Sequence, residues 1–302
     1  MTNSAGCTLT VSTKGVVLSN PSSKRRVYLL ANPDKPDAGG VLDDLRGFAQ
    51  SRCDLVGADL SMQGDGAIKA KADRIVVLGG DGTLIGVAGS LGTNQIPLIG
   101  VNAGKLGFLA EFSIDELKRC FDRAITDESI ISRRTVLKAN IIRNGGAHES
   151  SLAVNDCVIQ AGPPFRIISL GISINGQHLT DVDGDGLIVC TPSGSTAHNL
   201  SAGGPVMQPG VDAIILTPLC PHSLTHRSMV IERESAIEIQ AQDVNPGTTA
   251  ILDGQVSHPL QPGDCVTLSR FEADFLLVHN PLYAKWHNLV TKLHWGQSPN
   301  HR

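Results

Sequence analysis

Two patterns of hydrophobic and polar positions divide the chain. Between residues 27 and 126, short apolar runs at 27–30, 75–78 and 97–101 alternate with amphipathic segments at 41–49 and 114–125. This alternation is typical of a parallel sheet with helices on its faces. The segment at 114–125 has a start signal, because Ser113 can cap it and Glu116 completes a capping box. We therefore predict an α/β domain over residues 24–128.

After residue 128 the pattern changes to β-branched runs at 136–142, 167–174 and 237–241. Asn-Gly pairs at 144–145 and 175–176 are the strongest short signal for a β-hairpin turn. A mainly antiparallel, β-rich domain over residues 129–269 is predicted. The segment 270–302 carries Tyr283, Trp286 and Trp295 and is expected to pack back on the first domain. The Ser/Thr-rich residues 1–23 are expected to form a poorly ordered leader.

Charge and composition narrow the class of partner. The net charge of −4 and the pI near 6.2 give no general attraction for nucleic acid or for an anionic membrane surface, which favours a small-molecule partner. No run approaches the roughly 20 apolar residues of a membrane helix. The seven cysteines form no C-x-x-C pair and are widely spread, so we expect a cytoplasmic protein with reduced cysteines: Cys7, Cys53, Cys120, Cys157, Cys190, Cys220 and Cys265.

The sharpest chemical motif follows the apolar run at 75–78. There, Gly79, Gly80 and Gly82 surround the carboxylate of Asp81. Ligands bind at the carboxyl ends of parallel strands, and glycines let backbone N–H groups approach a phosphate, with a helix expected after Thr83. A carboxylate beside a phosphate can accept a proton from an attacking hydroxyl or hold a metal, although a plain turn with a capping aspartate has the same residues.

A second candidate segment spans residues 183–205. A predicted strand at 187–191 runs into a stretch rich in hydroxyl groups and glycine, which suits a polar ligand such as a ribose or an adenine edge. The alternative is an ordinary Ser/Gly loop. His222 and His226 are four residues apart and could share a helix face, but without an obvious third ligand a polar turn is favoured over a metal site.

The chain lacks the P-loop, zincin, nucleophile-elbow and G-x-G-x-x-G motifs. Six ordered segments, taken together, resemble the NAD kinase family over most of the chain. They are the GGDG motif at 79–82, the GVN-x-G-x-LGFL stretch at 100–109, Asn155-Asp156, the long motif at 185–205, the motif at 216–224, and Asp253-Gly254-Gln255. GGDG alone also occurs in related form in lipid kinases and phosphofructokinases.

The resemblance implies a Rossmann-like N-terminal domain, a β-sandwich-like C-terminal domain and a phosphotransferase that makes NADP from NAD and ATP or polyphosphate. It implies that Asp81 accepts the proton of the ribose 2′-hydroxyl and that Gly79, Gly80 and Gly82 face the phosphates with Mg²⁺ or another divalent metal, with no metal site built by the protein alone. A homodimer or homotetramer is expected. The residues implied to contact NAD are Asp81, Gly82, Asn155, Asp156, Arg166, Asp185, Thr196, Ala197, His198, Asn199, Leu200, Ser201 and Gln255.

Two positions depart from the family pattern. His198 stands where tyrosine is usual, and Gly86 stands where a longer, often basic or small apolar, residue is common. Histidine can still stack on a base, whereas loss of a basic side chain at Gly86 would weaken a phosphate contact. Two rival hypotheses stay open at this point: a lipid kinase with a GGDG motif, and a protein that only senses NAD or NADPH.

Overall fold

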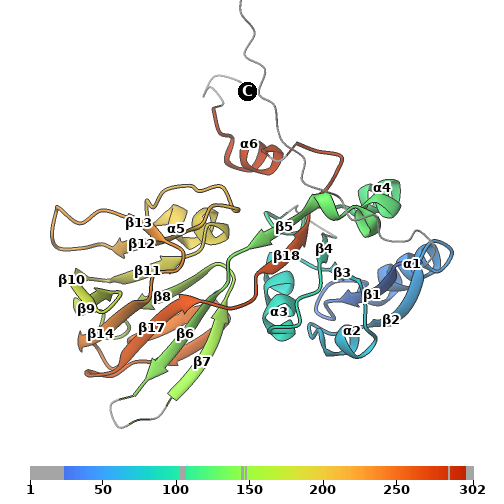
Figure 1. The fold of residues 1–302 in the computed structure, drawn as a ribbon. Coiled ribbons are helices and arrows are strands. Elements are labelled where there is room, and N and C mark those ends of the chain that lie inside the picture. Colours follow the sequence, from blue (N-terminus) through green and yellow to red (C-terminus); the bar gives the residue numbers. More distant parts are fainter. Residues whose placement is uncertain (1–23, 103–106, 144–145, 147, 285, 297–302) are drawn as a thin grey trace, which may run out of the picture.

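The computed structural model describes residues 24–102, 107–143, 146, 148–284 and 286–296, in three six-stranded sheets (Figure 1). The predicted leader at 1–23 and the predicted turn at 144–145 lie outside the described residues. The mixed α/β and β-rich fold class is confirmed. Within the described ranges, no helix is both long and apolar enough to cross a membrane.

The first sheet has the strand order β2-β1-β3-β4-β18-β5. Its strands are β1 (Arg26–Ala31), β2 (Asp54–Asp59), β3 (Arg74–Leu78), β4 (Leu98–Val101), β18 (Phe275–Val278) and β5 (Ile131–Arg134). All pairs are parallel except β18 with β5. Two separate apolar clusters cover the two faces of the sheet. The helices that supply them are α1 (Ala38–Gln50), α2 (Asp65–Lys69), α3 (Asp81–Leu91) and α4 (Ile114–Thr126).

Every element predicted in this part of the sequence is present. The capping box of α4 is formed, with Ser113 Oγ accepting from Glu116 N and Ser113 N donating to Glu116. The pattern missed β2, whose residues are only half-buried, and the five-residue α2. The proposed boundary at residue 129 does not follow the sheets: β5 lies in the first sheet, because β18 returns from the end of the chain to pair with it.

The β-rich domain packs two antiparallel sheets over one apolar core, on the left of Figure 1. One sheet contains β10 (Gln177–Gly184), β9 (Ile168–Ile174), β14 (Ile237–Asp243), β17 (Cys265–Arg270), β6 (Leu137–Ile142) and β7 (His148–Ala153). The other contains β13 (Met229–Glu232), β12 (Ala213–Leu219), β11 (Gly186–Cys190), β8 (Asp156–Gln160), β15 (Thr249–Leu252) and β16 (Val256–Pro259). The predicted turn between β9 and β10 is confirmed by positive φ angles of 51° at Asn175 and 76° at Gly176.

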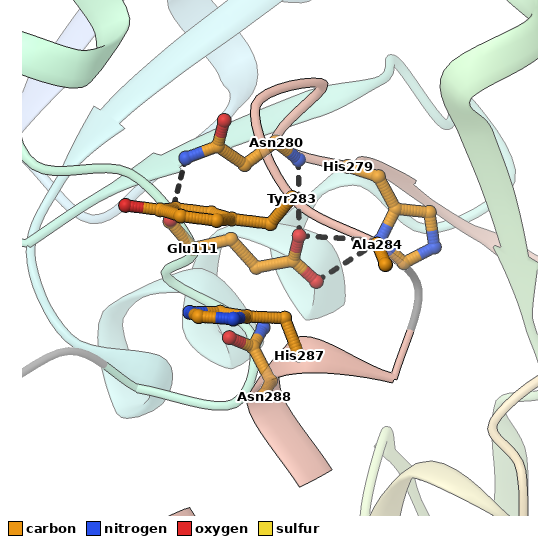
Figure 2. A pocket seen from close by; sticks show the side chains of 7 residues that line it. All are labelled: Glu111, His279, Asn280, Tyr283, Ala284, His287 and Asn288. Carbon is orange, nitrogen blue, oxygen red and sulfur yellow. Dashed lines mark hydrogen bonds and ion pairs between the residues drawn. The ribbon is translucent and has the colours of Figure 1, made fainter. Parts of the chain in front are cut away.

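The C-terminal segment is tied to the α/β domain through Glu111. Its buried carboxylate accepts a hydrogen bond from Asn280 N at 3.0 Å and contacts His279 Nδ1 at 3.0 Å, while Asn280 Nδ2 donates to the Glu111 carbonyl (Figure 2). Tyr283 stacks on His287 with ring centroids 4.1 Å apart and bonds to Glu116 through its hydroxyl. These contacts position α6 (His287–Leu293) beside the first domain.

Candidate active site

The glycine-rich turn lies between β3 and α3, at the carboxyl edge of the first sheet. Gly79 N donates to Val101 O at 2.9 Å, which joins the ends of β3 and β4. A side chain at Gly79 would collide with Thr83, whose hydroxyl accepts from Asn32 Nδ2 at 3.0 Å. Because its N–H is used in joining the two strands, Gly79 shapes the turn, and the N–H groups left for a phosphate are those that follow it.

Helix α3 begins at Asp81, three residues before the predicted start after Thr83. The first N–H groups of a helix have no partner within it, so those of Asp81 and Gly82 are placed to meet an anion. Gly80 is the extended cap residue, and a side chain there would meet only open space. The turn therefore exposes main-chain N–H groups at the start of α3 with open space beside them.

The Asp81 carboxylate is held by three backbone N–H groups of the segment after β4. Oδ2 accepts from Phe108 N at 2.7 Å, and Oδ1 accepts from Leu109 N at 3.0 Å and Ala110 N at 2.9 Å. Gly107 lies so close that a Cβ there would overlap the carboxylate. The end of the GVN-x-G-x-LGFL stretch and the residue after it thus fix the orientation of Asp81. Residues 103–106 of this stretch lie outside the described residues.

A second carboxylate organises the facing part of the β-rich domain. Asp253 accepts hydrogen bonds from the N–H groups of Val154 at 2.8 Å, Asn155 at 2.7 Å and Asp156 at 3.1 Å. Asp253 has a φ of 52° in the turn between β15 and β16, a conformation that aspartate tolerates better than most residues. The turn and the 154–156 segment are consequently one rigid unit.

Burial and charge act together on this unit. Burial, with a smaller contribution from the Asp253 charge, raises the pKa of Asp156 to about 7. Burial also raises the pKa of Asp253, although its three N–H partners oppose that shift. Asp156 is therefore a carboxyl group that titrates close to neutral pH, which is a common property of ligand-binding sites.

A cavity of about 480 Å³ opens beside the same unit. That volume lies in the range of small-molecule and cofactor sites. Four residues predicted to contact NAD line it, namely Asn155, Asp156, Ala197 and His198. The sequence analysis did not single out the other lining residues as ligand contacts: Val158, Gln160, Ile251, Asp253, Gly254 and Ser257.

Gln255 connects the cavity to the glycine-rich turn. Its Nε2 donates to Gly82 O at 2.9 Å, across 173 positions of sequence. Gly86 also faces Gln255, because a Cβ added at Gly86 would lie 3.7 Å from Gln255 Oε1. The predicted residues Asp81, Gly82 and Gln255 are thus brought together. Through this hydrogen bond the turn after β15 contacts the first turn of α3.

The hydroxyl-rich segment forms a short 3-10 helix, η2 (Ser193–Thr196), followed by α5 (His198–Ser201). Asn199 is fully buried: Nδ2 donates to the carbonyls of Ser195 and Pro205, and Oδ1 accepts from the Thr217 hydroxyl. Since its side-chain amide is occupied inside the protein, Asn199 positions this loop. Thr196, Leu200 and Ser201 are partly or fully exposed but do not line the cavity.

Two predicted residues lie elsewhere in this chain. Arg166 is exposed, and its carbonyl accepts from Asn245 Nδ2. Asp185 is exposed between β10 and β11, where its N–H donates to Leu219 O. Neither lines the 480 Å³ cavity. His222 and His226 lie in turns and not on a helix, and the described residues contain no group of three potential metal ligands.

The sequence analysis missed two residues that build the site. Asn32 follows β1 directly, at the same sheet edge as Gly79, and its position after a buried strand was the available signal. Asp253 stands before Gly254 in a hairpin turn and was treated only as part of a motif. Its role depends on contacts with residues about 100 positions away, which no local pattern reveals.

The fold and the site define a two-domain protein in which a glycine-rich turn at the start of a helix is joined through Gln255 to a cavity of nucleotide size. Family models of the ATP-NAD kinase N-terminal and C-terminal domains match residues 5–129 and 154–280. The NAD kinase of Geotalea daltonii is 41% identical over 230 residues, covering 76% of this chain and 81% of that protein. The NAD kinase of Geobacter sulfurreducens is 36% identical over 282 residues, covering 90% of this chain and 99% of that protein.

Solved structures share the fold. Yeast NADH kinase, in complex with NADH, superposes with a TM-score of 0.80 at 23% identity, covering 93% of this chain and 91% of that one. An Archaeoglobus fulgidus NAD kinase, in complex with ATP, superposes with a TM-score of 0.72 at 24% identity, covering 89% of this chain and 98% of that one. The chain belongs to the NAD kinase family and is a phosphotransferase.

Proposed function

We propose that this enzyme transfers a phosphoryl group to the 2′-hydroxyl of the adenosine ribose of NAD, with Asp81 as the proton acceptor. The observation that carries the proposal is the fixed carboxylate of Asp81 beside the N-terminus of α3. A secondary hydroxyl is a weak nucleophile, so a positioned base and an aligned phosphate are what the step requires.

The hydrogen bonds of Asp81 leave room for one more donor. A carboxylate has about four acceptor positions. Oδ1 uses two of them on Leu109 and Ala110, whereas among the described residues Oδ2 receives a hydrogen bond only from Phe108. The free position on Oδ2 fits the ribose hydroxyl, which would donate its proton as its oxygen attacks phosphorus.

The 480 Å³ cavity supports NAD as the acceptor substrate. Asp156 and Asn155 offer acceptors and donors for the edge of an adenine or for ribose hydroxyls, and His198 offers a flat ring for stacking. Gln255 links this cavity to Gly82, so a ligand that fills the cavity extends naturally toward Asp81. The nucleotide would thereby place its ribose between the two domains.

The residues present fit a divalent metal carried by the phosphoryl donor. Mg²⁺ binds through one or two carboxylates together with substrate phosphates, and no cluster of three ligands is needed. The metal would be held mainly by the phosphate oxygens of the donor at the glycine-rich turn, because the remaining position of Asp81 is assigned to the ribose hydroxyl. When bound, the metal would neutralise charge on the phosphates, while the N–H groups of Asp81 and Gly82 orient them.

ATP and polyphosphate both carry the phosphate chain that this turn would bind, and we propose either as donor. We further propose a homodimer or homotetramer in the cytoplasm. Six free cysteines among the described residues are consistent with a reducing compartment. The exposed apolar side chains of Phe165, Ile167 and Leu224 are consistent with an interface between copies.

The proposal is tested with Asp81→Asn. NADP formation from NAD, ATP and Mg²⁺ is read with an NADP-specific dehydrogenase, and NAD affinity is measured by calorimetry. Because proton transfer contributes about 10²–10⁴-fold, turnover should fall by that amount while the Kd for NAD stays within roughly threefold. Full turnover in the variant would overturn the role of Asp81. Wild-type protein that binds NAD but makes no product with any donor would indicate a sensor instead.

A further inference from the structure

The C-terminal helix α6 brings a cation to the glycine-rich turn. Lys292 lies one residue before the end of α6, and its Nζ is 4.8 Å from the ring centroid of Phe108. The backbone N–H of Phe108 is the one that donates to Asp81 Oδ2. A single residue therefore separates the ammonium group of Lys292 from the candidate catalytic carboxylate.

The ammonium group of Lys292 interacts electrostatically with the carboxylates of Asp81 and Glu111. Burial lowers the pKa of its amine, while the negative charges of Asp81 and Glu111 oppose that shift by favouring the ammonium form. Lys292 is half-buried rather than extended into solvent. Its side chain is held along the Phe108 ring by the cation–π contact, which orders a long and otherwise mobile stem.

Helix α6 is placed by contacts that are independent of Lys292. Glu111 fixes His279 and Asn280 at the start of the segment (Figure 2). Tyr283 bonds to Glu116. Glu111 lies in the segment that leads from the Asp81 partners into α4, and Glu116 lies in the first turn of that helix. The same stretch of chain therefore positions the carboxylate on one side and the cation on the other.

A phosphoryl donor needs such a cation. A triphosphate brings several negative charges to the turn, whereas a helix N-terminus supplies only about half a positive charge. Preorganised cations aimed at the transferring group are the usual complement. Gly86, in the second turn of α3, has no side chain that could supply this charge, so another element would have to present it.

We propose that Lys292 of α6 binds the phosphate chain of the phosphoryl donor, so that the C-terminal segment completes the donor site. This inference rests on the proposed kinase function. Donor binding and not NAD binding would depend on Lys292. The contact is to phosphate oxygens, so Lys292 should strengthen the binding of a phosphoryl donor that lacks a nucleobase as much as it strengthens the binding of ATP.

The test compares Lys292→Met, which keeps the stem against Phe108 and removes the charge, with Lys292→Arg, which keeps both charge and ring contact. Lys69→Met, on the exposed end of α2, is the control for net charge. Tripolyphosphate and ATP are titrated separately. Both tryptophans of the chain, Trp286 and Trp295, lie beside or after α6, so their fluorescence reports binding at this segment without turnover.

Lys292→Met should raise the KM for ATP and the Kd for tripolyphosphate by roughly tenfold, the loss expected for one charge-assisted contact. The Kd for NAD should change less than twofold, and Lys292→Arg should recover most of the donor affinity. Wild-type donor affinity in Lys292→Met, or an equal loss of NAD affinity, would overturn the inference. Unchanged donor affinity with a shifted pH profile of kcat would also overturn it, because Lys292 would then act only through its charge on Asp81. Failure of the wild-type enzyme to make NADP would count against the proposed function.

Discussion

The Asp81 carboxylate illustrates how a reactive group is oriented by main chain alone. Its three N–H partners come from consecutive residues, 108 to 110, and Gly107 leaves the space that the carboxylate occupies. Fixed hydrogen-bond donors keep such a group in its productive geometry without reorganisation during the reaction. Its orientation therefore depends on a residue that contributes no functional group of its own.

Gly107→Ala tests this dependence. The added methyl group would overlap Asp81, so the carboxylate must rotate away and lose at least one N–H partner. We expect kcat to fall by about 10²-fold, since misplacement by about 1 Å has that effect. NADP formation is the measurement. Gly89→Ala, on α3 where a Cβ meets nothing, is the matched control and should keep full activity; equal activity in both variants would contradict the prediction.

Asp156 gives the enzyme a stability that depends on pH. Its pKa is about 7 in the folded protein against an ordinary value of 3.8. Between these values the folded state binds more protons than the unfolded state, so the free energy of unfolding falls as pH rises from about 4 to 7. The loss is on the order of 4 kcal/mol at most and is complete above pH 7.

Asp156→Asn removes this loss because the amide does not ionise. Melting temperatures measured from pH 4.5 to pH 8.5 should show little difference from wild type at the acid end and a more stable variant, by several degrees, at the alkaline end. A difference that is constant across the range would show that Asp156 does not titrate in this window.

Elements with a regular pattern could be predicted, whereas elements fixed by distant partners could not. Helix α4 was predicted to within one residue because its amphipathic period and capping box are local properties. In contrast, β18 and β5 complete the first sheet although about 140 residues separate them. A strand that pairs across such a distance leaves no local sign of which sheet it joins.

The C-terminal segment depends on Glu111 for its position. Glu111→Ala would leave Asn280 N and His279 Nδ1 without their partner, at a cost of about 1–3 kcal/mol for buried polar groups. We expect faster hydrogen exchange over residues 279–296 and a lower donor affinity, with little change in NAD affinity. Asp115→Ala, an exposed acidic residue in the first turn of α4, is the control. Unchanged exchange in the Glu111 variant would contradict the prediction.

At the scale of the whole molecule, the site combines segments that lie far apart in the sequence. The motifs located most of them, since Asp81, Gly82 and Gln255 do converge. They did not reveal that Asn199 is enclosed by its own loop or that Arg166 and Asp185 lie away from the cavity. A motif identifies residues that matter to the protein; which of them face a ligand is decided by packing and by the orientation of each side chain.

Gln255 links the two domains beside the glycine-rich turn. It reaches from the turn after β15 to the first turn of α3, and because its hydrogen bond is exposed, it should contribute little to stability. Its removal would instead loosen the placement of the cavity relative to Asp81. Gln255→Ala should therefore lower kcat/KM for NAD by roughly tenfold while the melting temperature changes by less than about 2 °C.

Gln255→Glu separates the hydrogen bond from the packing of the side chain. Glutamate has nearly the same shape, but it presents a carboxylate to the carbonyl of Gly82 where the amide donated a proton. If the hydrogen bond positions the two domains, this variant should lose at least as much kcat/KM as Gln255→Ala. If shape alone matters, Gln255→Glu should retain wild-type values, and the alignment of the domains would then have to come from the packing of the turn itself.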